Sequence, residues 1–236
     1  MKQVLPALIK LSILPIVFAM LILFLHSRSQ NTHVGSSEAD LVRAAEPKPP
    51  MPAPAFKKAV TTLFWIGEEA SGENGFISNR KSHWDPEWVK RFGGVDDPLH
   101  RKGFFPAAFR PKENPFYVAL PFADTGEEGM FKPIANTIRA DSRGRLTKNR
   151  WVEVQAHDKS CFGQWEDVGP FGENDFDWVF GSAAKPLNNV GDKAGLDVSP
   201  AMAECLSMDG LGTTQWRFVN EEDVPEGPWK ETVTDR

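Results

Sequence analysis

The chain has few of the residues and motifs that build the common catalytic and cofactor sites. Tyrosine occurs once and cysteine twice in 236 residues. There is no glycine-rich phosphate loop, no dinucleotide-binding glycine motif and no nucleophilic serine elbow. His83 and His157 do not have the spacing of metal ligands, and the two cysteines are too far apart in the sequence to suggest a zinc site. We therefore expect no metal, no cofactor and no Ser-His-Asp chemistry.

Positive charge is also scarce in most of the chain. The formal net charge is −5, but residues 1–48 hold five Lys or Arg and only three Asp or Glu, so the remainder is more acidic, at −7. Phosphate backbones require a basic surface. The composition therefore argues against nucleic acid as a partner and favours a neutral polymer or a small polar ligand.

A long apolar run lies near the start of the sequence. Residues 11–25 are apolar apart from Ser12 and Pro15, and no cysteine follows that would indicate a lipoprotein. The run has the length of a signal-peptide core, but Ser27-Arg28-Ser29 is a poor cleavage site. Residues 1–29 are expected to be either a signal peptide or, in preference, an uncleaved hydrophobic anchor helix. The positive-inside rule would place the rest of the chain outside the cytoplasm.

The remaining residues divide into a linker and a folded domain. Residues 30–55 are rich in Ser, Ala and Pro, which favours an extended spacer. The domain is expected over 56–236. Short strands and helices between Gly/Pro loops indicate a mainly β domain, a small barrel with long loop insertions. Strands are expected over 60–66, 114–122, 150–156 and 213–219, and short helices over 85–93 and 199–206.

The two cysteines leave two interpretations open. Cys161 and Cys205 fit one disulfide in an oxidising compartment. They fit two unrelated buried thiols equally well, because spacing alone does not reveal the Cα separation that a bridge requires.

Three segments in the second half of the chain carry most of the functional signal. Trp165-Glu166-Asp167-Val168-Gly169-Pro170-Phe171 ends in an Asp/Gly/Pro turn, Leu196-Asp197-Val198-Ser199-Pro200-Ala201 leads an Asp into a helix, and Trp216-Arg217-Phe218-Val219 is an alternating strand. Together they resemble the RlpA-like proteins, whose double-psi β-barrel is shared with expansins and family 45 glycoside hydrolases. The resemblance covers residues 150–220 and implies a six-stranded double-psi β-barrel. It departs at Val168, where the family usually has a basic residue, and in the long loop between the first two segments.

Two aspartates are the candidate catalytic residues. Cleavage of a glycosidic bond needs a proton donor, and a second carboxylate when water is the nucleophile; in lytic cleavage a hydroxyl of the sugar attacks instead. Asp197 is expected to be the acid, with a pKa raised by nearby aromatic rings, and Asp167 its partner. Each also has a structural alternative, Asp197 as a cap of backbone N–H groups and Asp167 as part of its own turn. Asp158, Glu166 and Asp177 are weaker candidates.

Three further residues are candidates for contacts with the substrate. Trp165 and Trp178 could stack on pyranose rings, although core packing is the alternative for both. His157 could carry a proton or bind substrate at the end of a strand, although a solvated histidine is the alternative.

These features predict an exported or membrane-anchored protein of the bacterial cell envelope, either secreted or held in the inner membrane and facing the periplasm. Its expected function is cleavage of cell-wall glycan as a glycoside hydrolase or lytic transglycosylase. The expected partner is a polysaccharide, peptidoglycan or a cellulose-like glycan, and the expected state is a monomer. The alternative is a non-catalytic, expansin-like glycan-binding or envelope interaction module.

Overall fold

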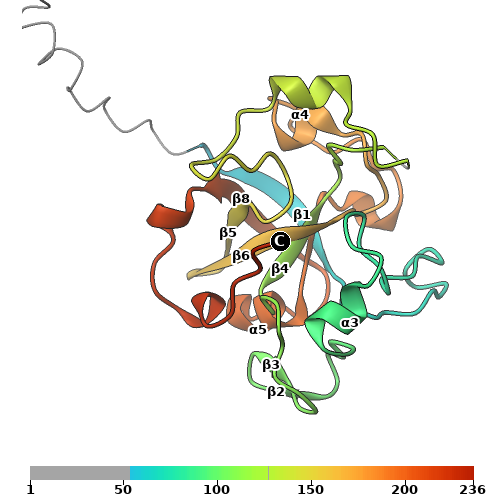
Figure 1. Ribbon diagram of the computed structural model, residues 1–236, viewed down its shortest axis with the longest axis vertical. Helices are drawn as coiled ribbons and strands as arrows, with labels where there is room; N and C mark the ends of the chain where they lie inside the picture. Colours follow the sequence, from blue (N-terminus) through green and yellow to red (C-terminus); the bar gives the residue numbers. More distant parts are fainter. Residues whose placement is uncertain (1–53, 127) are drawn as a thin grey trace, which may run out of the picture. The chain divides into compact units, whose positions relative to one another are not determined.

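The computed structural model describes residues 54–126 and 128–236, and six of the strands in this part close into a barrel (Figure 1). The strand order is β1-β7-β4-β6-β5-β8. The strands are β1 (Lys57–Leu63), β4 (Tyr117–Leu120), β5 (Trp151–Ala156), β6 (Lys159–Val168), β7 (Leu196–Val198) and β8 (Gly212–Val219). The pairs β1/β7 and β4/β6 are parallel and the others antiparallel. A separate hairpin contains β2 (Arg101–Lys102) and β3 (Phe105–Pro106).

The mainly β fold predicted from the sequence is confirmed. The expected signal or anchor segment over 1–29 and almost all of the expected linker over 30–55 lie outside the described residues. In the described part, no helix is both long enough and apolar enough to cross a membrane.

Short helices flank the barrel. They are α3 (Trp88–Phe92), α4 (Phe176–Val179) and α5 (Pro200–Leu206), with 3₁₀ turns η1 (Pro133–Thr137), η2 (Gly191–Lys193), η3 (Glu221–Asp223) and η4 (Pro228–Lys230). In the view of Figure 1, α4 and α5 lie at opposite ends of the barrel. The start of α5 follows the sequence prediction, because Ser199 Oγ accepts a hydrogen bond from the Met202 amide and Pro200 takes the first helical position.

The barrel is filled by aliphatic and aromatic side chains. Val152 and Val154 on β5 pair with Phe218 and Trp216 on β8, and all four side chains are buried. Trp151, at the start of β5, is also fully buried and belongs to the same core cluster. Fully burying an aromatic or aliphatic side chain stabilises a fold by about 1.5–3 kcal/mol, so this concentration of rings accounts for much of the stability of the domain.

Two barrel strands did not stand out in the sequence. The longest strand, β6, has buried residues on both faces, including Gly163, Gln164 and Glu166, so it lacks the alternation of a half-exposed strand. The strand β7 has three residues and lies between β1 and β4 in the middle of the sheet order. Its place in the barrel depends on those non-local partners rather than on its own residues.

The cysteines form a disulfide, which answers the question that the sequence left open. Cys161 on β6 is bonded to Cys205 on α5, with a Cα–Cα distance of 6.3 Å. The bridge holds α5 against the barrel wall.

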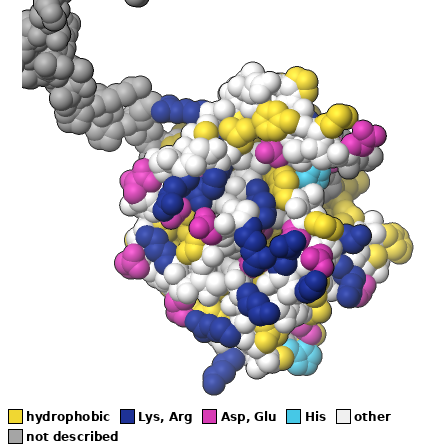
Figure 2. Space-filling model, viewed as in Figure 1, with side chains coloured by type: hydrophobic (Ala, Val, Ile, Leu, Met, Phe, Trp, Pro, Cys, Tyr) yellow, Lys and Arg dark blue, Asp and Glu magenta, His cyan; other side chains and the backbone are white. Residues whose placement is uncertain are grey.

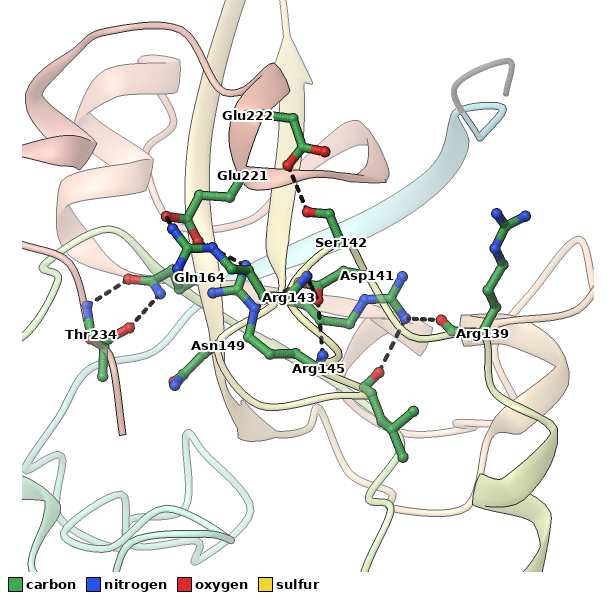
Figure 3. A network of polar contacts seen from close by, with 12 residues as sticks. Arg139, Asp141, Ser142, Arg143, Arg145, Asn149, Gln164, Glu221, Glu222 and Thr234 are labelled. Carbon is green, nitrogen blue, oxygen red and sulfur yellow. Dashed lines mark hydrogen bonds and ion pairs between the residues drawn. The ribbon is translucent and has the colours of Figure 1, made fainter. Parts of the chain in front are cut away.

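The loop over 139–150 and the C-terminal segment over 220–236 are joined by a polar network (Figure 3). Gln164 exchanges two hydrogen bonds of 2.8 Å with the backbone of Thr234. Arg145 pairs with Asp141 at 2.6 Å and with Glu221 at 3.0 Å. Figure 2 shows Lys and Arg side chains gathered near the middle of the face in view, among Asp and Glu side chains. Much of this local positive charge is therefore compensated by neighbouring carboxylates.

Replacing both Cys161 and Cys205 by Ala should lower the free energy of unfolding by about 2–4 kcal/mol, because the bridge closes a long loop in the unfolded chain. Denaturant unfolding followed by tryptophan fluorescence measures the change. The wild-type protein in strong reductant is the matched control and should unfold at the same midpoint as the double variant. A stability equal to that of the oxidised wild type would contradict the bridge.

Candidate functional site

Strand β4 brings the two predicted aspartates to one face of the barrel wall. Ala119 on β4 pairs with Asp167 on β6 and with Asp197 on β7. Paired residues of adjacent strands point to the same face, and with strands about 4.8 Å apart the two aspartate Cα atoms are roughly 10 Å apart. A methyl group on Gly169 would lie 3.4 Å from Asp197 Oδ2 and 3.8 Å from the Ala119 Cβ. The turn after Asp167 therefore lies beside the Asp197 carboxyl.

The shared face is the outer one. Val118 and Leu120, the neighbours of Ala119 along β4, belong to the main core of the barrel. Ala119 instead packs in a second cluster, with the rings of Trp88 and Tyr117. The two aspartates thus lie outside the barrel interior, next to an aromatic cluster that excludes water from part of their surroundings.

A bulge in the pairing of β4 with β6 selects which acid reaches this face. Trp165 is opposite Val118, but Asp167 rather than Glu166 is opposite Ala119. One extra residue in a strand redirects the side chains that follow it. The bulge therefore sends Trp165 into the core and presents Asp167 beside Asp197.

Asp167 is buried and held by backbone amides. Its exposed fraction is 7%, and its Oδ1 accepts hydrogen bonds of 2.8 Å from the N–H groups of His83 and Val168. Burial raises the pKa of Asp167 to about 7, and these two hydrogen bonds oppose part of the rise. The carboxyl is fixed in position by the loop that carries His83.

Asp197 is the more accessible of the two acids. The residue as a whole is partly exposed although its carboxyl lies in buried surroundings, and its Oδ1 accepts a hydrogen bond from Thr62 Oγ1 on β1. Burial raises the pKa of Asp197 to about 7, and the negative charges of Asp167 and Glu68 contribute to the rise. Two repelling acids that titrate near neutrality hold at least part of one proton between them at pH 7. The pair has the properties of a proton donor with a neighbouring carboxylate.

Of the three weaker candidates, only Glu166 is buried. Its exposed fraction is 3%, burial raises its pKa to about 8, and its Oε1 has no hydrogen-bond partner within the described part of the chain. Asp158 lies in the exposed turn between β5 and β6, and Asp177 is an exposed residue of α4. Neither of these two lies in the strand row that joins Asp167 and Asp197.

The two predicted stacking rings are core residues. Trp165 and Trp178 are 0% and 1% exposed, so neither offers a ring face to a ligand. Trp165 Nε1 donates to the Asp167 carbonyl at 2.7 Å, and Trp178 Nε1 donates to the Gly195 carbonyl at 2.8 Å. Burial of an indole in the core leaves its N–H in need of a partner. From inside the core, each tryptophan thus holds the stretch of backbone that carries one of the two aspartates.

His157 is separated from the acidic pair. It lies in the exposed turn between β5 and β6, with φ of 55°, and precedes Asp167 by roughly 30 Å of extended strand. The structure does not bring it to the two carboxyls.

Thr62 and His83 contact the pair, and sequence reasoning did not identify either as part of the site. Thr62 is paired in register with Asp197 on the neighbouring strand. His83 lies in a loop, where its Nε2 is 3.1 Å from Thr125 Oγ1 and its amide binds Asp167. Thr62 is an ordinary strand residue in the sequence. The contact of His83 is made by its backbone amide, which only folding brings to Asp167, so the sequence held no signal for either residue.

Within residues 54–126 and 128–236, no three or more His, Cys, Asp or Glu side chains are grouped so that they could hold a metal ion. No protein-family model and no curated protein matches the chain. The geometry of the acidic pair and the sequence motifs are therefore the observations that bear on function.

Replacing Asp197 by Asn should make the protein more stable above pH 7, by about 1–3 kcal/mol. A carboxyl whose pKa is raised on folding binds its proton more tightly in the folded state. Its contribution to stability is present below about pH 4 and is lost as the pH rises through about 7. Denaturant unfolding at a series of pH values checks this: the wild type should lose stability between pH 4 and 7 more steeply than the variant.

The exposed Asp209 provides the matched control, because Asp209→Asn makes the same chemical change away from the strand row. Parallel stability curves for the wild type, Asp197→Asn and Asp209→Asn would show that the Asp197 carboxyl is not perturbed.

Proposed function

We propose that this protein cleaves a cell-wall glycan, with Asp197 as the proton donor. The observation that carries the proposal is Asp197, a partly exposed residue whose carboxyl has its pKa raised to about 7 by burial and by the neighbouring Asp167. A general acid works best when its pKa is near the working pH. The barrel class proposed is the double-psi barrel of the RlpA-like proteins. The closed six-stranded barrel with two parallel strand pairs supports it, as do the motifs around the two aspartates.

A lytic cleavage fits the site better than hydrolysis. In an inverting hydrolase a second carboxylate must activate water. Asp167 is 7% exposed, and its Oδ1 is occupied by two backbone N–H groups, so it is poorly placed to bind and orient water. Its charge instead contributes to raising the pKa of Asp197, which keeps the proton available near pH 7. One accessible acid suffices when a hydroxyl of the sugar is the nucleophile.

Asp197 alone can carry out both proton transfers of the proposed cleavage. Its carboxyl donates a proton to the glycosidic oxygen as the bond from that oxygen to the anomeric carbon breaks. A hydroxyl group of the same sugar then attacks the anomeric carbon and forms an internal anhydro ring. The Asp197 carboxylate accepts the proton that this hydroxyl releases. The acid is thereby restored for the next cleavage.

The location proposed is the cell envelope outside the cytoplasm. The apolar run over 11–25 supports export or anchoring. The Cys161–Cys205 disulfide supports an oxidising compartment.

A non-catalytic glycan-binding module is the second candidate, and the binding of Asp167 by backbone amides favours it. Such contacts are those of an acid that holds a loop in place. Pull-down on insoluble peptidoglycan together with an assay for new sugar ends separates the candidates. Retention without new ends supports the module, and release of anhydro-sugar ends supports the lytic enzyme.

Asp197→Asn should reduce glycan cleavage by about 10²–10⁴-fold, the usual contribution of a general acid. The Thr62 hydrogen bond can be kept by the amide oxygen, so the fold should be preserved. Release of soluble fragments from peptidoglycan measures the rate, with Asp209→Asn as the matched control. Turnover like that of the wild type in Asp197→Asn would remove the assignment.

Thr62→Val should raise the pKa of Asp197, because the hydroxyl hydrogen bond favours the charged carboxylate. The rate of cleavage by the wild type should fall as the pH rises above about 7, where the acid is deprotonated. In the variant this fall should begin at higher pH, while the rate at pH 5 stays close to that of the wild type. A uniform loss of rate with an unchanged pH profile would show that Thr62 is only structural.

A further inference from the structure

A pocket of about 280 Å³ lies beside the turn that follows Asp167. Its volume is just below the range of roughly 300–1,000 Å³ that is usual for small-molecule sites, so it suits one ring-sized group. The walls come from three segments: Pro121 just after β4, residues 170–175 at the end of the Asp/Gly/Pro turn, and residues 187–190 in the loop before β7.

Two contacts link the walls of the pocket to the acidic pair. Pro170 follows directly after Gly169, the residue that borders Asp197 Oδ2. Glu173, which also lines the pocket, lies 4.0 Å from His83 Nδ1, and the His83 amide binds Asp167. A glycan bound at Asp197 that follows the Asp/Gly/Pro turn would place an adjoining unit in this pocket.

The wall nearest the turn is built around the ring of Phe171. A methyl group on Gly75 or on Gly191 would lie 2.9 Å and 2.2 Å from this ring, too close for any side chain. Both glycines have positive φ, as does Phe171 itself, at 51°. A bulky residue with positive φ is uncommon and is a reason to look for function. The ring is packed between two loops and gives the pocket a fixed apolar surface.

The remaining surfaces are apolar or uncharged, with acids as the only ionisable groups. Leu187 and Val190 are 72% and 57% exposed, which is unusual for large aliphatic side chains. The lining contains Glu173 and Asp175 but no Lys, Arg or His. Asp175 is buried and accepts hydrogen bonds from the amides of Trp178 and Leu187. Lys132 lies behind this wall, with its Nζ 3.6 Å from Glu173 Oε1 and 2.7 Å from Asn174 Oδ1, and it balances one of the two carboxylates. With Asp175 counted, the charge next to the pocket stays net negative, which disfavours an anionic ligand.

The geometry points to a binding site for one uncharged pyranose ring of the glycan, next to the unit at Asp197. That the ligand is a glycan rests on the proposed function. The new element is that the sugar ring bound in this pocket is uncharged. The apolar C–H face of the ring would lie on Phe171, with Leu187 and Val190 at its edge. The amide of the exposed Asn189 would bind a hydroxyl or acetamido group. A uronic acid or phosphorylated sugar would bind more weakly, because of the net negative charge next to the pocket.

Calorimetric titration of oligosaccharides into the Asp197→Asn protein tests the site without consumption of the ligand. Cellohexaose and the N-acetylated chitohexaose should bind, and hexagalacturonate, of equal length but charged, should bind at least about tenfold more weakly. Adding Leu187→Trp should fill the pocket and weaken binding of the neutral hexamers by about tenfold or more. Val190→Trp, from a different residue of the same loop, should act in the same way.

Leu99→Trp is the matched control, because Leu99 is 86% exposed and lies outside the pocket lining. Unchanged affinity in both pocket variants, absence of binding of either neutral hexamer, or equal binding of hexagalacturonate would overturn the inference. If the wild type cleaves peptidoglycan but neither Leu187→Trp nor Val190→Trp changes the affinity for the neutral hexamers, the pocket is refuted and the proposed function stands. Binding through the pocket without cleavage by the wild type would refute the catalytic proposal alone.

Discussion

The pairing of β4 with both β6 and β7 is the constraint on which the site depends. Asp167 and Asp197 are far apart in the sequence, and they meet only because Ala119 lies between them in the strand order of a closed barrel. Closure leaves no free edge at which either strand could slip. A slip of one residue in β6 would turn Asp167 to the opposite face of the sheet. The barrel thus acts as a rigid support that sets two negative charges close together.

The core stabilises this arrangement at a second level. Trp165 and Trp178 are buried, and their indole N–H groups bind the backbone at Asp167 and just before Asp197. The rings therefore fix the positions of the acids from inside the barrel, while the loop at His83 fixes Asp167 from outside. The cost of placing two carboxyls in partly dry surroundings appears as their raised pKa values. Raised carboxyl pKa values of this kind are typical of sites where an acid must keep its proton near neutral pH.

Much of the fold could be predicted from the sequence, which also singled out the two aspartates that the structure places on one face of the barrel. The start of α5 follows from local rules, because Ser199 and Pro200 act on the nearest turn only. The residue types alternate along β5 and β8, although only β8 has one face in the core and the other toward solvent. β6 was missed because both of its faces are covered, and β7 because three residues are too few for a pattern. The bulge that presents Asp167 rather than Glu166 depends on pairing with β4 and leaves no trace in the sequence. The tryptophans were identified as important, but only folding decides whether a ring packs inward or faces solvent.

The central claim is that two carboxyls on one face of the barrel share a proton near neutral pH. A carbon-detected NMR titration of the aspartate side chains, with assignments from Asp167→Asn and Asp197→Asn, tests it most directly. The account predicts that the two signals lost in these variants titrate near pH 7, and that removal of either acid lowers the midpoint of the other. If both signals titrated below pH 5, like ordinary surface aspartates, the acids would be independent and ionised, and the site would have no proton to donate.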